Sequence, residues 1–185
     1  MSNSPSHSPS DSVRNREADV LRGTAHVYGD NIDTDRIIPG KYTKTLDTSV
    51  LAAHVMEDLD PDFRHRVVRG DIVVAGDNFG CGSSREQAPV ALKAAGVSAI
   101  VARSFAAIFY RNAINIGLPL LEVSEHAIAH GATLQIELGT GVIHDLSGQT
   151  RYQSKTLPPM MVAILKAGGL VPFLALHGDF VLPRE

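Results

Sequence analysis

Cysteine is almost missing from this sequence, in which Cys81 is the only one among 185 residues. A single thiol cannot form an internal disulfide, and it cannot by itself hold a zinc ion or an iron–sulfur cluster. We therefore expect a reduced, cytoplasmic protein that holds no metal of its own. Tryptophan is absent as well, which argues against large aromatic stacking surfaces.

The sequence also lacks a strong charge of one sign and any long apolar run. Its formal net charge is −3, which gives no reason to expect nucleic acid or an acidic membrane as a partner. No apolar stretch approaches the roughly 20 residues that a membrane helix needs, and the N-terminus has no apolar core of a secretory signal. With 44% hydrophobic residues over this length, the composition is typical of one soluble globular domain.

Residues 1–22 differ from the rest of the chain because they are rich in Ser, Asn, Pro and charged side chains. Such a segment cannot bury enough apolar surface to order itself. We expect a disordered N-terminal leader over residues 1–22, followed by one domain over residues 23–185. The acidic residues within the leader argue against a transit peptide.

Short apolar runs and segments of helical spacing alternate along the first two thirds of the domain. This succession is typical of an α/β fold with parallel strand pairing, so we expect a mostly parallel central sheet. A turn-rich, acidic loop is expected at 30–35. The pattern predicts strands at 24–28, 71–75, 98–102 and 118–123, and helices at 49–57, 84–95 and 105–115.

The last third of the chain has a different pattern. Residues 133–138 and 141–144 alternate apolar and polar side chains around Gly139-Thr140, which predicts a hairpin. Residues 158–167 begin with proline and are followed by two glycines, as a helix often is. We expect a C-terminal strand or tail from residue 170 onwards.

The segment richest in chemistry is GDNFGCGSSRE, residues 76–86, between a predicted buried strand and a predicted helix. Ligands of α/β folds bind at such junctions. Ser83 and Glu86 have capping-box spacing, a helix start attracts anions, and Arg85 suits a carboxylate or a phosphate. Pro89 fits a first helical turn, which would place the helix start nearer Gln87. The motif predicts an anion site, and the alternative is a capped helix with a solvated arginine.

Familiar phosphate and nucleophile motifs do not fit this segment. It lacks the G-K-[ST] of a Walker loop, the G-x-S-x-G of a hydrolase elbow and the third glycine of the dinucleotide fingerprint. Three parts of the chain, taken together, do resemble a known family. GDNFGCGSSRE, the later ARSFAAIFYRNAINIGLPLLE and the upstream YGDNIDTDRIIPGKY are similar to the swivel domain shared by aconitases and isopropylmalate dehydratases.

The resemblance runs from about Gly23 to at least Glu122 and implies an aconitase-swivel-like β/β/α domain. It implies that Ser83 is the base that takes a proton next to a substrate carboxylate. Ser84 and Arg85 match residues that hold this carboxylate, and Asp35 matches an acidic residue that supports the site. The [4Fe–4S] cluster of the family is expected on a larger partner subunit, which fits the near-absence of cysteine here.

The resemblance also implies a function: the small subunit of a hetero-oligomeric hydro-lyase that interconverts 2-isopropylmalate and 3-isopropylmalate in leucine biosynthesis. In the family, the loop that contains Tyr42, Thr43 and Lys44 faces the variable group of the substrate. Because Lys44 could reach a further carboxylate, homoaconitate, citraconate and a substituted malate stay open as di- or tricarboxylate substrates. Many family members carry histidine where this chain has Gln87, a departure that we expect to leave the activity in place.

Two other functions remain for comparison. A stand-alone anion-binding or regulatory module would need the anion site but no serine placed as a base. A single-chain aconitase is excluded because the cluster domain is missing. The eight histidines suggest no shared metal site, and Arg103 and Arg111 are as consistent with structural ion pairs as with ligand binding.

Overall fold

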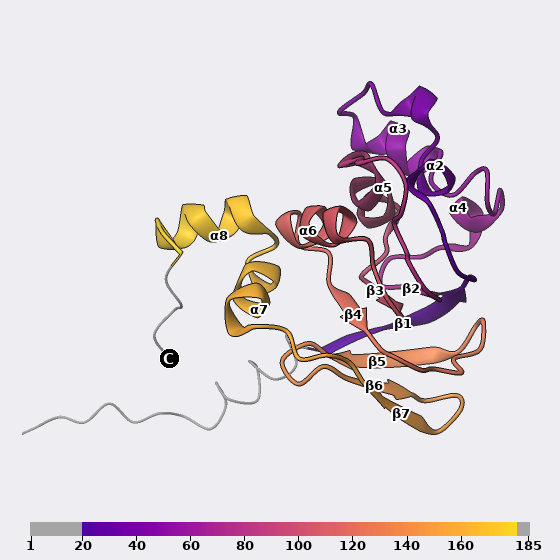
Figure 1. Cartoon of the computed structure of the whole chain (residues 1–185), viewed down its shortest axis with the longest axis vertical. Coiled ribbons are helices and arrows are strands. Elements are labelled where there is room, and N and C mark those ends of the chain that lie inside the picture. The colour runs from indigo at the N-terminus through magenta and orange to yellow at the C-terminus, as the bar shows by residue number, and fades with distance from the viewer. Residues whose placement is uncertain (1–19, 181–185) are drawn as a thin grey trace, which may run out of the picture.

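The computed structural model describes residues 20–180, and it contains one seven-stranded sheet in the order β4-β3-β2-β1-β5-β6-β7 (Figure 1). The α/β class is therefore confirmed. The strands are β1 (Val20–Val27), β2 (Ile72–Ala75), β3 (Ala99–Ala102), β4 (Leu120–Glu122), β5 (Thr133–Glu137), β6 (Val142–Asp145) and β7 (Thr150–Gln153).

The sheet is mixed rather than mostly parallel. Strands β1 to β4 pair in parallel, whereas β5, β6 and β7 pair antiparallel with β1 and with one another. The short turns after β5 and β6 explain this difference, because a tight turn can join only antiparallel neighbours. The hairpin that the sequence predicts is confirmed as β5 and β6, and β7 extends it by a strand that the sequence did not indicate.

β1 joins the two halves of the sheet. Its first five residues pair with β5, and its last three, Ala25 to Val27, pair with β2. A buried hydrogen bond supports this register: His26 Nε2 lies 2.8 Å from Asp71 Oδ2, just before β2. Burial acts to raise the pKa of Asp71, but hydrogen bonds from His26 and from the amides of Val68 and Thr24 outweigh it and lower the pKa.

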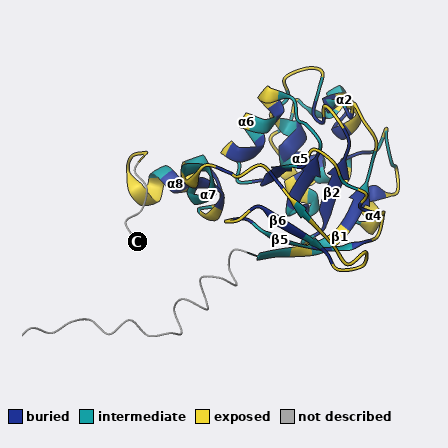
Figure 2. Cartoon of the chain, turned by 60° about the horizontal axis from the view of Figure 1, so that its bottom comes forward, coloured by how far each residue is buried: buried dark blue, intermediate teal, exposed yellow. Residues whose placement is uncertain are grey.

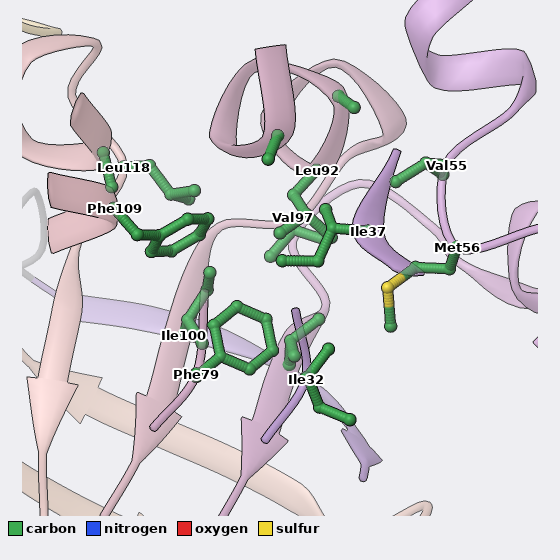
Figure 3. Close-up of a cluster of buried hydrophobic side chains, with 14 of the residues drawn as sticks. Ile32, Ile37, Val55, Met56, Phe79, Leu92, Val97, Ile100, Phe109 and Leu118 are labelled. Carbon is green, nitrogen blue, oxygen red and sulfur yellow. The ribbon is translucent and has the colours of Figure 1, made fainter. Parts of the chain in front are cut away.

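The two faces of the parallel strands bury different clusters. In β2, Val73 and Ala75 face one cluster, and Ile72 and Val74 face the other, as the alternation of a strand requires. Figure 3 shows the first cluster, where Phe79 and Phe109 pack together with Ile100 of β3. The second cluster contains side chains of β5 and β6, so the antiparallel half curls over the face opposite the helices.

Helices cover the first face of the sheet and form the C-terminal end. Figure 1 shows α5 and α6 above the parallel strands, and α7 and α8 to one side of α6. The helices are α2 (Thr34–Ile37), α3 (Thr48–Ala53), α4 (Phe63–Arg66), α5 (Gln87–Ala95), α6 (Ala107–Asn115), α7 (Pro159–Lys166) and α8 (Leu170–His177), with a 3₁₀ turn at Gly40–Tyr42.

The predictions for the two ends of the domain are wrong. β1 begins at Val20, three residues inside the predicted leader, because Val20 and Leu21 pair with β5. The rest of the leader prediction falls on residues 1–19, outside the described residues. The segment from Leu170 is helix α8 rather than a strand or tail, because Pro172 lies in its first turn, where proline is tolerated.

The two C-terminal helices pack on α6 through a small apolar cluster centred on Phe173. Figure 2 shows them at the edge of the molecule, with exposed positions on α8. Within residues 20–180 no single helix is long and apolar enough to span a membrane; α7 and α8 reach that length and composition only as a pair, bent by 93°.

Candidate functional site

Three loops meet beyond the carboxyl ends of β1, β2 and β3. The loop after β1 and the loop after β2 run side by side, because Asp33 and Cys81 form a parallel bridge and the Gly80 amide donates to the Ile32 carbonyl at 2.8 Å. Phe79 forms a second bridge to Phe105, in the loop after β3. Ligands of open α/β sheets bind at this end of the strands.

Arg103 holds the three loops together. Its guanidinium donates to Asp30 at 2.5 Å and lies 3.0 Å from Asp77, so one side chain spans all three strand ends. A backbone hydrogen bond from Asp77, followed by the hydrogen bond from Arg103, lowers the pKa of Asp30. A larger residue at Gly76 would displace the Asp30 carboxylate from this arrangement, because a Cβ there would lie 1.7 Å from Asp30 Oδ1. Arg103 thus forms structural ion pairs, one of the two roles that the sequence left open.

Glycines let the loop after β2 approach α6 closely. Gly80 has a φ of 78°, and a Cβ on it would lie 2.2 Å from the ring of Phe109. Gly82 has a φ of 85°, which also favours glycine. The backbone between Gly80 and Gly82 therefore turns sharply and carries Ser83 outward, toward the start of α6.

A cavity of about 250 Å³ lies between this loop and α6. Ser83, Ser84 and Arg85 line it together, so the structure brings together the three site residues that the sequence predicts in this loop. Thr34 of α2 also lines the cavity, and its hydroxyl donates to the Ser83 carbonyl at 2.8 Å. Both serine side chains are exposed to solvent.

The predicted capping box is wrong. Helix α5 begins at Gln87, as the position of Pro89 indicated, and no side chain caps it. Residues 82–86 are consequently a loop, and among the described residues none of their amides donates a hydrogen bond to the chain. Successive free amides beside glycines of positive φ form a concave surface that suits an anion.

Arg85 connects this loop to the α2 segment. Its Nη1 lies 2.7 Å from Asp35 Oδ1 and 3.3 Å from the Ile38 carbonyl oxygen, and only 19% of its side chain is exposed. Asp35 therefore orients Arg85, as a residue that supports the site would. Within residues 20–180, both of these contacts engage Nη1 of Arg85.

The three residues predicted to face the variable group of a substrate do not line this cavity. Tyr42 stacks on His54, with ring centroids 3.7 Å apart, and the Thr43 hydroxyl donates to the Gly40 carbonyl. Lys44 is exposed. Gln87 ties the segment to α5, because its Nε2 donates to the Thr43 carbonyl at 3.1 Å.

Glu57 also holds the segment that contains Tyr42 and Thr43. It accepts hydrogen bonds from His54 and Tyr42 and forms an ion pair with Lys41 at 2.9 Å. Partial burial acts to raise the pKa of Glu57, but the hydrogen bond from Lys41 and then those from His54 and Tyr42 lower it overall. The Tyr42 ring is therefore held in place rather than free to turn into the cavity.

The described residues include no group of three or more His, Cys, Asp or Glu side chains that could hold a metal ion. Cys81 is a single, half-buried thiol. The residues present do not fit an iron–sulfur cluster bound to this chain alone. A larger cavity of about 620 Å³, between α7 and α8, contains none of the predicted site residues and has a mainly apolar lining.

Comparisons with known proteins agree with this fold. The family model described as "Aconitase C-terminal domain" matches residues 21–126. The "3-isopropylmalate dehydratase small subunit 1" of Methanopyrus kandleri is 52% identical over 86% of this chain and 95% of its own length. The "2,3-dimethylmalate dehydratase small subunit" of Eubacterium barkeri is 51% identical over 83% of this chain and 95% of its own.

Among solved structures, the chain is similar to a 3-isopropylmalate dehydratase structure from Methanocaldococcus jannaschii. The two are 44% identical, with a TM-score of 0.82, over 86% of this chain and 95% of that one. The chain therefore spans nearly the full length of the proteins that it resembles.

Proposed function

Because the chain belongs to the aconitase C-terminal domain family of dehydratase small subunits, we propose that it interconverts 2-isopropylmalate and 3-isopropylmalate as part of a two-subunit hydro-lyase. In this proposal it is a cytoplasmic protein of leucine biosynthesis, and it is active only when joined to a larger subunit. The observation that carries the proposal is the meeting of Ser83, Ser84 and Arg85 at one cavity, in a loop whose amides at residues 82–85 have no partner among the described residues.

Ser83 is the proposed base. In the dehydration direction its oxygen takes the proton from the carbon next to a substrate carboxylate, and in the hydration direction the serine returns it. A serine hydroxyl is a very weak base, so its alkoxide must be stabilised by neighbouring donors in a site closed to water. The unpaired amides around Ser83 and the charge of Arg85 are such donors.

Arg85 and Ser84 are the proposed carboxylate ligands. Asp35 and the Ile38 carbonyl engage Nη1 of Arg85, which leaves Nε and Nη2 to form a two-point contact with a carboxylate. The Asp35 charge offsets that of Arg85, so this chain offers a dianionic substrate little net positive charge. Further attraction has to come from the partner subunit.

The larger subunit is the proposed carrier of a [4Fe–4S] cluster, which supplies a Lewis acid for the leaving hydroxyl group. The shape of the site supports the need for a partner. Ser83 and Ser84 are exposed at a small open cavity, whereas a serine base requires a site from which water is excluded. This chain therefore contributes one wall of an active site that closes only in the complex.

A substituted malate such as 2,3-dimethylmalate is the second candidate substrate. The relative named for it is 51% identical to this chain, which lies within the 48% to 54% of relatives named for 3-isopropylmalate. In both proposals Lys44, with Tyr42 and Thr43, borders the substrate from the segment that Gln87 fastens to α5.

The test is a steady-state assay of the complex. The chain is co-expressed with its candidate large subunit, the cluster is reconstituted without oxygen, and unsaturated-acid absorbance is followed with 3-isopropylmalate and 2,3-dimethylmalate. We expect Ser83→Ala to lower kcat about 10²–10⁴-fold, as the loss of a general base does, with little change in thermal unfolding. Ser124→Ala, at an exposed serine outside the cavity, is the matched control and should keep full activity.

The alternatives predict other results. Activity on 2,3-dimethylmalate alone would keep the mechanism and change the substrate. A stable, cluster-loaded complex that is inactive on every substrate would overturn the enzyme proposal for this pair and favour the anion-binding module. Full activity of Ser83→Ala would exclude Ser83 as the base.

A further inference from the structure

Ser83 is held in the structure by one hydrogen bond. Its carbonyl oxygen accepts from the Thr34 hydroxyl at 2.8 Å, and within residues 20–180 its own hydroxyl and amide have no partner. The residue is exposed, so little packing fixes it. A base that must meet one carbon atom of a substrate needs a defined position. The hydrogen bond from Thr34 is the direct contact that gives Ser83 such a position.

Thr34 is a rigid support for this loop. It is 2% exposed, and its amide donates to the Cys81 carbonyl at 2.9 Å. The amide and the hydroxyl of Thr34 therefore hold the carbonyls on both sides of Gly82, where the backbone turns with a φ of 85°. Threonine is also β-branched, which restricts its side-chain rotamers. One buried residue thus fixes the backbone just before and at the proposed base.

The same hydrogen bond determines how the peptide between Ser83 and Ser84 is oriented. This peptide is trans, so its carbonyl and its amide point in opposite directions. Because the Ser83 carbonyl points at Thr34, the Ser84 amide points away from Thr34, and it has no partner among the described residues. Loss of the Thr34 hydroxyl would free this peptide to rotate, and both the Ser83 side chain and the Ser84 amide would move with it.

The geometry points to Thr34 as a positioning residue, whose hydroxyl acts through the Ser83 carbonyl to hold the base at the carbon that loses the proton. This inference rests on the proposed dehydratase function and deepens it. The next residue of α2 has a parallel role, because Asp35 contacts Arg85 at 2.7 Å. Two successive residues of one short helix therefore set the position of the proposed base relative to the proposed carboxylate ligand.

The test compares kcat and KM for 3-isopropylmalate in complexes reconstituted with the large subunit. Thr34→Val removes the hydroxyl and keeps the shape of the buried side chain. We expect kcat to fall about 10- to 100-fold, because a small misplacement of a catalytic group can cost about 100-fold in rate. The KM should stay within about twofold of the wild-type value, since the lost interaction acts on the chemical step. Thr34→Ser keeps the hydroxyl and should recover most of the rate.

A double-mutant cycle separates positioning from a merely structural role. In a Ser83→Ala background Thr34→Val should lower kcat no further, because no base remains to be positioned. Thr150→Val is the matched control, because the Thr150 hydroxyl also donates to a backbone carbonyl, that of Gly148 at 3.1 Å, but lies outside the cavity. It should keep the wild-type kcat. If Thr34→Val does not assemble, Thr34→Ser and Thr34→Ala give the same comparison of side chains with and without a hydroxyl.

A wild-type kcat in Thr34→Val, or a Thr34→Ser variant as slow as Thr34→Val, would overturn the inference. An equal fall of kcat with and without Ser83 would assign Thr34 to the fold instead. A raised KM with an unchanged kcat would mean that the hydroxyl binds the substrate itself. All of these results presuppose an active wild type and a slow Ser83→Ala variant. Failure of the proposed function differs from them, because there the wild type is inactive or Ser83→Ala is fully active.

Discussion

Arg85 illustrates how much a single contact adds to a motif. The resemblance predicts that Arg85 holds a carboxylate and that Asp35 supports the site, without saying how. The 2.7 Å contact between Asp35 and Arg85 joins the two, and the Ile38 carbonyl lies on the same side of the guanidinium. The planar shape of the group allows this, because one edge can be held by the protein while another faces a ligand.

Replacing Arg85 with lysine tests this division of the guanidinium. A lysine ammonium is a single point charge and cannot pair with Asp35 and bind a carboxylate at two points. We expect Arg85→Lys to raise the KM for 3-isopropylmalate about 10- to 100-fold and to change kcat by only a few-fold. Each factor of ten in KM corresponds to about 1.4 kcal/mol of lost binding free energy. Steady-state kinetics of the complex provide the measurement.

Arg36→Lys is the matched control for this variant, because Arg36 is the exposed arginine next to Asp35 and does not line the cavity. It should retain the wild-type KM. A fall in kcat with an unchanged KM in Arg85→Lys would contradict a ground-state role in carboxylate binding.

The residue pattern predicted some site residues better than others. Ser83, Ser84 and Arg85 are adjacent in the sequence, so their meeting at one cavity required only the correct loop. Gln87 was recognised as a departure from the family, but its hydrogen bond to the Thr43 carbonyl joins positions 44 residues apart and has no local signal.

At the level of elements, buried runs were predicted best. The strands IVVA and AIVA are fully buried, and a short apolar run beside glycine indicates such a strand directly. The exposed β7 has three exposed positions out of four, so it has little apolar signal of its own. α8 was mispredicted because a proline in an apolar run reads as a break, although the first turn of a helix accepts it.

The approach of the loop after β2 to α6 depends on Gly80, and substitution there should be costly. An alanine would combine a positive φ with a Cβ only 2.2 Å from the Phe109 ring. We expect Gly80→Ala to lower the free energy of unfolding by about 3 kcal/mol or more, the sum of left-handed strain and overpacking. Urea denaturation followed by circular dichroism measures the change.

Gly139→Ala is the matched control, because Gly139 lies in the turn between β5 and β6, and a Cβ there would meet nothing within 4 Å. It should change the free energy of unfolding by less than about 0.5 kcal/mol. A Gly80→Ala protein as stable as this control would mean that the loop can move away from Phe109, and the cavity beside Ser83 would then not be preformed.

On the scale of the whole molecule, β1 decides how the two halves of the sheet come together. The sequence predicted the parallel half and the hairpin separately, but it did not place one against the other. That arrangement depends on β1 changing partners along its length, from β5 at Val20–Thr24 to β2 at Ala25–Val27. Pairing between segments more than 100 residues apart has no periodicity that a local pattern can reveal.

Two truncations test this role of β1 together with the predicted leader. Removal of residues 1–18 leaves all of β1 in place, and we expect the free energy of unfolding to change by less than about 0.5 kcal/mol, because the composition of the leader predicts no packed structure there. Removal of residues 1–24 deletes the whole ladder between β1 and β5. At about 1 kcal/mol for each lost hydrogen bond, this protein should be destabilised by at least about 3 kcal/mol.

Urea denaturation and gel filtration compare the two truncated proteins. The shorter protein should also associate, because it exposes the edge of β5 and uncovers Leu134 and Ile136, which are fully buried in the intact domain. Equal loss of stability in both proteins would mean that the leader contributes to the fold. If both truncated proteins keep the stability of the full-length protein, the β5–β7 half is held by its apolar contacts with β2 and β3 alone. β1 would then be dispensable as the strand joining the two halves.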